Sequence, residues 1–161
     1  MSSKYINQRN LRQVAFWLLY SHAMSSVSIS LLAVVVATIA GFIISSIWYS
    51  DSVFGASWQR ATGASHKPLH ASWKQYLSSI ISNLILAYIL AHFVQFALIA
   101  MNLPGEIVDG AIVGAWAWLG FVATTGFVNI YHKKQSIELW VIETGQHLVS
   151  FVIMAILVTT L

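Results

Sequence analysis

The sequence predicts an all-α integral membrane protein: a four-helix up-down bundle preceded by a helix that lies along the membrane surface. Composition is the first reason. Of the 161 residues, 58% are hydrophobic and only 8% are charged, whereas about a quarter of a soluble domain carries charge. The second reason is four apolar segments near the length of about 20 residues that a helix needs to cross the hydrocarbon layer. The connections between the later segments are short, so sequential helices are expected to be antiparallel neighbours.

Residues 1–27 form an N-terminal extension whose apolar stretch, 14–24, is too short to span a bilayer. Trp17 and Tyr20 suit the headgroup level, where amphipathic rings are enriched, so we expect an interfacial helix here. A signal peptide is the alternative, because basic residues precede a short apolar core. The segment 21–24, Ser-His-Ala-Met, is a poor cleavage site and favours the interfacial helix.

The transmembrane domain is expected over residues 28–161. Its apolar runs predict four spans, at about 29–49, 77–101, 107–128 and 137–161. The long connection 50–76 mixes basic and aromatic residues, which indicates surface-lying structure rather than a free loop. Asn102-Leu-Pro-Gly105 is a turn signal between the second and third spans.

The positions of lysine and arginine indicate the orientation, because these residues concentrate on cytoplasmic loops. The connections 50–76 and 131–136 lie on one side of the membrane and carry Arg60, Lys67, Lys74, Lys133 and Lys134. The other side has Lys4, Arg9 and Arg12, but its 102–106 turn has no basic residue. We therefore expect a multi-pass protein of the inner (plasma) membrane with both termini outside.

Several function classes are excluded by composition. The chain has no cysteine, which rules out disulfides, thiolate metal sites and cysteine nucleophiles. Its net charge of +3 is scattered rather than clustered, so no nucleic-acid partner is expected. No phosphate-binding loop or dinucleotide fingerprint is present, and no cofactor is expected. The expected partners are the lipid bilayer, further copies of the chain and another membrane protein.

An aromatic motif, W-Y-S-x-x-x-F-G-x-x-W, ends the first span and is formed by Trp48, Tyr49, Ser50, Phe54, Gly55 and Trp58. The motif suits anchoring at the boundary between membrane and water, with an aromatic ligand box as the alternative. On this motif, residues 28–161 resemble a bacterial family of small four-span integral membrane proteins of unknown function. The third span, with Gly110, Gly114 and Gly120, is similar too. The resemblance implies a fold but no activity.

Away from the ends of the predicted spans lie three acidic or histidine side chains: Glu143, His147 and His92. Each is a functional-site hypothesis, because a charge in hydrocarbon costs at least a few kcal/mol. Glu143 and His147 are four residues apart and therefore share one helix face, which Ser150 and Met154 continue. We expect this face to turn inward, away from lipid, with His92 at a similar depth.

Asn83 and Asn129 are expected to complete a polar layer with Glu143 near the cytoplasmic ends of the spans. At 1.5 Å per residue, Asn83 and Glu143 both lie roughly 9 Å from the start of their spans. Such layers often only tie helices together, so structural hydrogen bonding and a proton relay or cation site both stay open. Glu143, His147 and His92 offer metal ligands, but their depths agree only roughly, and no metal site is expected.

Two further patterns leave alternatives open. Gly110 and Gly114 form a small-xxx-small pair, which permits close helix contact either in a dimer face or inside the bundle. His66 and His70 are four residues apart, and His132 lies at the other connection. They could bind a metal if helical, but surface histidines usually have no such role.

The function favoured by these observations is transport. We expect a small homo-oligomeric channel or carrier for a proton, cation or small solute, using the intramembrane pair Glu143 and His147. An oligomer is expected because four helices around a filled core leave little room for a pore. The alternative is a non-catalytic accessory or assembly subunit that docks through the 50–76 connection. A membrane-embedded enzyme has the least support, because no nucleophile accompanies the Glu–His pair.

Overall fold

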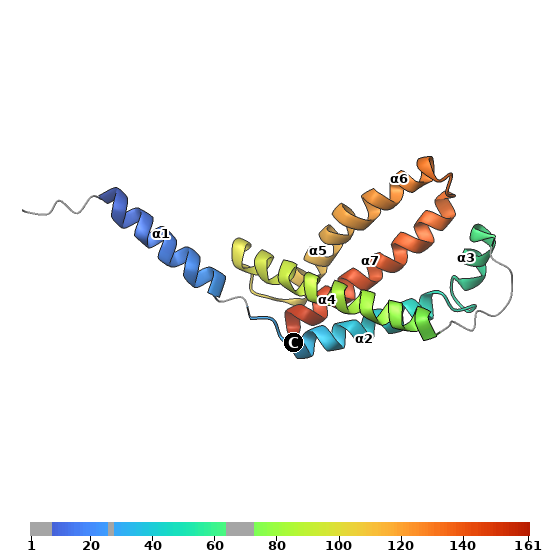
Figure 1. The fold of residues 1–161 in the computed structure, drawn as a ribbon, viewed down its shortest axis with the longest axis horizontal. Coiled ribbons are helices and arrows are strands. Elements are labelled where there is room, and N and C mark those ends of the chain that lie inside the picture. The colour runs from blue at the N-terminus through green and yellow to red at the C-terminus, as the bar shows by residue number, and fades with distance from the viewer. Residues whose placement is uncertain (1–7, 26–27, 64–72) are drawn as a thin grey trace, which may run out of the picture.

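The computed structural model describes residues 8–25, 28–63 and 73–161, and within these ranges the chain is helical and contains no strand (Figure 1). The elements in chain order are α1 Gln8–Ser25, α2 Leu31–Trp48, α3 Gly55–Thr62, α4 Trp73–Met101, α5 Ile107–Trp118, the π-helical segment η1 Leu119–Ala123, α6 Thr124–His132 and α7 Ile137–Thr160. The hydroxyl group of Ser136 begins α7 by accepting a hydrogen bond from the backbone N–H of Leu139 at 3.1 Å, which satisfies one of the free donors of the first turn.

Four helical stretches are long and apolar enough to cross a membrane, and this confirms the predicted fold class. They are Leu31–Trp48, Trp73–Met101, Ile107–His132 and Ile137–Thr160. The second and third spans extend beyond their expected limits of 77 and 128, because their helices continue through the polar residues next to the hydrocarbon. Lys74 and His132 lie in these extensions, where side chains of their kind reach the headgroups.

The expected N-terminal helix is present as α1, and in Figure 1 it stands apart from the four spans. It begins at Gln8, earlier than the expected apolar stretch, and Trp17 is exposed on it. The side chain of Tyr20 lies outside the described side chains. Helix α3 accounts for part of the surface-lying structure expected in the connection 50–76.

Helix α7 is the centre of the bundle. It packs against α2, α4 and α5, and Figure 1 shows it between the pair α2 and α4 on one side and the continuous helix α5–α6 on the other. The largest fully buried side chains come from α4 and α7: Leu90, Val94, Ser150 and Met154. These side chains fill the space between the two helices, so the centre of a single copy is closed.

Glycines let α5 approach α7 closely. A Cβ atom at Gly110 would lie 2.5 Å from Thr159 Oγ1 and 2.9 Å from the carbonyl oxygen of Ala155. At Gly114 it would lie 2.6 Å from the carbonyl oxygen of Phe151. The small-xxx-small pair therefore serves packing inside the bundle, one of the two alternatives that the sequence left open.

The third span is not a uniform α-helix. Leu119–Ala123 forms one wide π-helical turn between α5 and α6. Such π-bulges insert into otherwise regular helices and often occur at functional sites. Before this turn α5 packs closely along α7, whereas after it α6 makes few contacts with α7. The π-helical turn thus marks the point where the third span separates from the centre of the bundle.

Candidate functional site

A polar cleft lies where α6 separates from α7. Its volume is about 530 Å³, and it is lined by Tyr49, Val122, Thr125, Gly126, Asn129, Glu143, Thr144 and His147. The lining residues come from the end of α2, from η1 and α6, and from the first half of α7. Glu143 is half-buried in this cleft and His147 is exposed in it.

The side chain of Trp140 in α7 packs against α6. A Cβ atom at Gly126 would lie 3.2 Å from Trp140 Nε1 and 3.0 Å from Thr144 Cγ2, so α6 already touches α7 at this level. The ring of Trp140 also meets that of Phe127 edge to face, with centroids 5.7 Å apart. Its Nε1 atom is buried and has no hydrogen-bond partner among the described residues.

Glu143 carries the negative charge of the cleft. One carboxylate oxygen, Oε2, accepts a hydrogen bond of 2.7 Å from the side-chain amide of Gln135. Gln135 belongs to the connection 133–136, so this bond ties the loop to α7 at the mouth of the cleft. An amide donates a hydrogen bond but supplies no positive charge, so the carboxylate is not neutralised by this neighbour.

Tyr49 faces the same carboxylate from the end of α2. Burial, with a smaller contribution from the charge of Glu143, raises the pKa of Tyr49 to about 12. A group whose ionised form is this disfavoured stays an uncharged phenol at every physiological pH. The ring of Trp58 in α3 meets Tyr49 edge to face at 5.8 Å and supports it. The cleft therefore places a neutral aromatic ring beside a carboxylate.

The aromatic motif holds α2, α3 and α7 together at this end of the bundle. Trp48 Nε1 donates a hydrogen bond of 3.0 Å to the carbonyl oxygen of Ile142. Its ring lies 3.3 Å from the position that a Cβ atom would take at Gly145. Phe54 stacks on Trp48, with ring centroids 4.5 Å apart. Trp48 thus packs on α7, a contact that the expected anchoring role did not include.

The rest of the motif builds the turn between α2 and α3. The backbone N–H of Phe54 donates to the carbonyl oxygen of Trp48 at 3.0 Å, and that of Gly55 donates to Ser50 at 2.9 Å. The hydroxyl group of Ser50 donates to the carbonyl oxygen of Ile47 at 2.7 Å. A Cβ atom at Gly55 would lie 2.5 Å from the carbonyl oxygen of Tyr49, so only glycine fits this turn. The motif thereby positions Tyr49 at the cleft.

The structure brings together three of the five expected site residues. Glu143, His147 and Asn129 line the cleft. Asn83 is instead buried between α4 and its neighbours, and its side-chain amide donates 2.9 Å to the carbonyl oxygen of Ser79. His92 lies on α4 with Nδ1 2.8 Å from the carbonyl oxygen of Tyr88. Neither Asn83 nor His92 lines the cleft.

The face of α7 that is expected to turn inward does so at Ser150 and Met154 but not at His147. Gln146, Ser150 and Met154 are buried, whereas His147 is exposed. The side-chain amide of Gln146 donates to Ser45 Oγ at 2.9 Å and to Ser150 Oγ at 2.8 Å, which links α7 to α2. Gln146 lies four residues before Ser150, and this spacing is the signal in the sequence that could have placed Gln146 on the inward face.

Metal binding finds no support within the described ranges. They contain no group of three His, Asp or Glu residues that could hold a metal ion. His66 and His70 lie outside the described residues, and His132 is exposed at the end of α6. A zinc site needs at least three protein ligands, and the cleft itself offers only Glu143 and His147.

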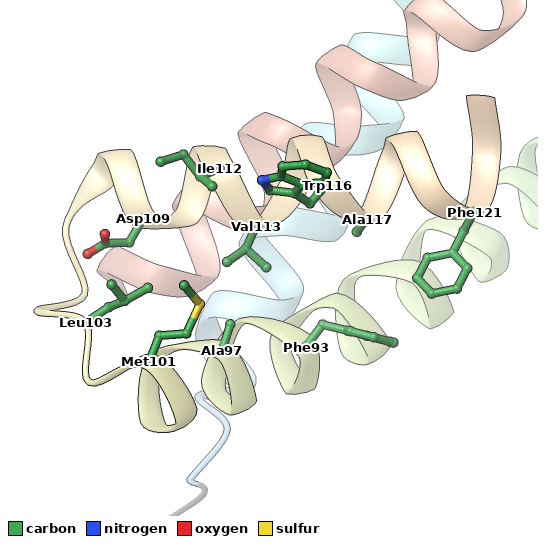
Figure 2. A pocket seen from close by; sticks show the side chains of 10 residues that line it. All are labelled: Phe93, Ala97, Met101, Leu103, Asp109, Ile112, Val113, Trp116, Ala117 and Phe121. Carbon is green, nitrogen blue, oxygen red and sulfur yellow. The ribbon is translucent and has the colours of Figure 1, made fainter. Parts of the chain in front are cut away.

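A second hollow is apolar and lies between α4 and α5 (Figure 2). Its volume is about 420 Å³, and its lining includes Phe93, Met101, Trp116 and Phe121. Figure 2 also shows Asp109 at one end. The Asp109 carboxylate accepts hydrogen bonds from the backbone N–H groups of residues 105 and 106, at 3.0 Å and 2.9 Å. It therefore serves as a helix cap. The lining of this groove is almost entirely apolar, so the polar cleft is the candidate site.

Comparison with known proteins gives a family without an assigned activity. Residues 32–159 match a family model described as "Protein of unknown function (DUF1761)". No curated protein and no solved structure matches the chain. The match fits the expected resemblance to a family of unknown function, while the span count and the aromatic motif rest on the chain itself.

Proposed function

Because the chain belongs to the DUF1761 family of proteins of unknown function, membership supplies no activity, and we propose one from the polar cleft. The protein is a small homo-oligomeric channel or carrier that moves a proton, cation or small solute across the inner membrane. Its site is built on Glu143 and His147. Both termini lie outside, so the connections 50–76 and 131–136 and the mouth of the cleft face the cytoplasm.

The observation that carries this proposal is the position of Glu143. It lies about six residues after the start of α7 at Ile137, which is roughly 9 Å along the helix axis. A carboxylate at such a level of a membrane helix is costly and marks a pathway or ligand site by default. Here it borders an open cleft, and among the described residues it accepts a hydrogen bond only from the uncharged amide of Gln135. A ligand or proton is thus able to reach the charge.

An oligomer is proposed because the described part of one copy offers no path to the far side. The fully buried side chains Leu90, Val94 and Met154 close the centre of the bundle beyond the cleft. Passage across the membrane therefore needs a second surface, and a second copy of the chain provides one. A closed symmetric arrangement of identical copies is the commonest form of soluble protein oligomer.

Flux measurements on proteoliposomes test the proposal. Wild-type protein is expected to pass protons or monovalent cations down a gradient, and Glu143→Gln is expected to lower the flux at least about tenfold, because the only acidic residue of the cleft is lost. The matched control is Glu138→Gln, which removes an exposed carboxylate in the first turn of the same helix. Equal flux in wild type and Glu143→Gln would discard the site.

The alternative function, a non-catalytic accessory or assembly subunit, is favoured by one observation. The apolar groove between α4 and α5 is bordered by Trp116, which is 68% exposed. A large exposed aromatic residue beside a groove suits packing against another membrane helix. Wild-type protein that gives no flux above that of protein-free liposomes would favour this alternative over transport.

A further inference from the structure

We propose that the cleft binds a small organic cation, an amine or ammonium compound with a single positive charge, and that Glu143 is its counter-ion. This inference rests on the proposed transport function and narrows its substrate class. It concerns the polar cleft between α6 and α7. Four properties of the lining carry it: its volume, its charge, its aromatic character, and polar groups that have no side-chain hydrogen bond to another described residue.

The volume of the cleft suits an organic molecule. At about 530 Å³, it lies in the range of about 300–1,000 Å³ that small-molecule sites occupy. A water molecule takes up about 30 Å³ of liquid volume, so a proton carrier or a bare metal ion would leave most of the cleft to solvent. A cation with several carbon atoms would displace that solvent.

The charge of the cleft favours a ligand that carries one positive charge. Glu143 is its only acidic residue, and the lining contains no lysine or arginine. A divalent metal ion would need further anionic or imidazole ligands, and His147 is the only other candidate in the lining. An ammonium group needs a single carboxylate and neutral acceptors around it, which is the set that the cleft offers.

The aromatic wall adds a second attraction for a cation. Tyr49 borders the cleft and stays an uncharged ring, supported by Trp58 at 5.8 Å. Cations are attracted to the faces of such rings when they approach within about 6 Å. Val122 and Gly126 supply apolar surface on the opposite wall, from η1 and α6. A cation with an apolar body would use both walls.

Polar side chains with spare hydrogen-bonding capacity complete the site. The side-chain amide of Gln135 donates a hydrogen bond to Oε2 of Glu143. No described residue donates to the other carboxylate oxygen. Within the described residues the amide of Asn129 and the ring of His147 form no side-chain hydrogen bond. The two groups reach the cleft from opposite helices, α6 and α7. They are placed to accept hydrogen bonds from those N–H groups of an ammonium ligand that do not bind to Glu143.

Equilibrium binding to the full chain in lipid nanodiscs tests the inference, with benzylammonium as the probe. Saturable binding of one probe per chain is expected. Benzyl alcohol and benzoate, which have the same ring with no charge or a negative charge, are expected to bind at least about tenfold more weakly, because they lack the ionic hydrogen bond. This comparison uses wild-type protein and does not depend on the folding of any variant.

Two variants assign the probe to the cleft. Glu143→Gln preserves shape and is expected to weaken benzylammonium binding at least about tenfold, whereas Glu138→Gln is expected to leave it unchanged. Benzyl alcohol binding as tightly as benzylammonium, or equal binding by wild type and Glu143→Gln, would overturn the inference. If proton flux depends on Glu143 but benzylammonium does not bind, the substrate class is wrong and transport stands. If benzylammonium binds at Glu143 but no flux is found, the binding site stands and transport is wrong.

Discussion

Replacing Gly114 with leucine is expected to force α5 away from α7 and to lower the free energy of unfolding by about 1–3 kcal/mol. The first carbon of any side chain at this position would lie 2.6 Å from the carbonyl oxygen of Phe151 and 2.9 Å from the Cβ atom of Ala155. A backbone oxygen has no rotamer through which it can move aside. The two helices must therefore separate, and because α7 is the centre of the bundle, the loss spreads to α2 and α4.

Titration with sodium dodecyl sulfate in mixed micelles, followed by tryptophan fluorescence, measures this change. The control is Gly120→Leu, the same substitution in η1, where the added Cβ has no atom within 4 Å apart from the chain neighbours and the adjoining helix backbone. Its free energy of unfolding is expected to stay close to that of wild type, because the side chain enters open space. Equal destabilisation by the two substitutions would show that the added bulk of leucine anywhere in the third span, and not the contact with α7, sets the effect.

A valine in place of Gly55 is expected to break the turn between α2 and α3 and to cost about 2 kcal/mol or more. Its Cβ atom would meet two backbone carbonyl oxygens, those of Tyr49 and Ser50, at 2.5 Å and 2.7 Å. Neither oxygen can move without opening the turn that holds Tyr49 beside Glu143. We therefore expect this variant to lose flux as well as stability.

The neighbouring residue provides the control for Gly55→Val. Ala56 is exposed, and Ala56→Val adds the same β-branched side chain one position later in α3. Unfolding and flux are measured for both variants in parallel. If Ala56→Val lowers stability and flux as much as Gly55→Val does, a general loss of α3 is responsible and the contact at Gly55 is not.

The four spans could be predicted from the sequence because a single physical requirement, a run of uncharged apolar residues, decides them. Their ends were harder to predict. The helix that begins at Trp73 and the one that ends at His132 pass through polar residues, since backbone hydrogen bonds continue where the hydrocarbon stops. The π-helical turn at Leu119–Ala123 left no signal in the pattern of apolar residues.

The candidate site could be predicted only in part, for a geometric reason. Spacing along one helix correctly groups Glu143 with His147, but it does not say how α4 is rotated about its own axis. Asn83 and His92 therefore lie outside the cleft. The same limit applies to Trp48, whose partner Ile142 is 94 residues away in the chain. The motif was visible in the sequence, and its role in seating Tyr49 at the cleft was not.

The central claim is that a water-accessible polar cleft separates α6 from α7 inside the membrane domain. The chain has no cysteine, so single cysteines can be introduced without removing others. Thr125 and Thr124 are adjacent and both exposed, but only Thr125 lines the cleft.

Reaction with a cationic, membrane-impermeant thiol reagent in intact membranes is therefore the most direct measurement. Thiols react as thiolates, which form in water and not in hydrocarbon. Thr125→Cys is expected to react at least about tenfold faster than Thr124→Cys, and from the cytoplasmic face. Equal rates at the two positions, or no reaction at Thr125→Cys from either face, would contradict the cleft and the function proposed for it.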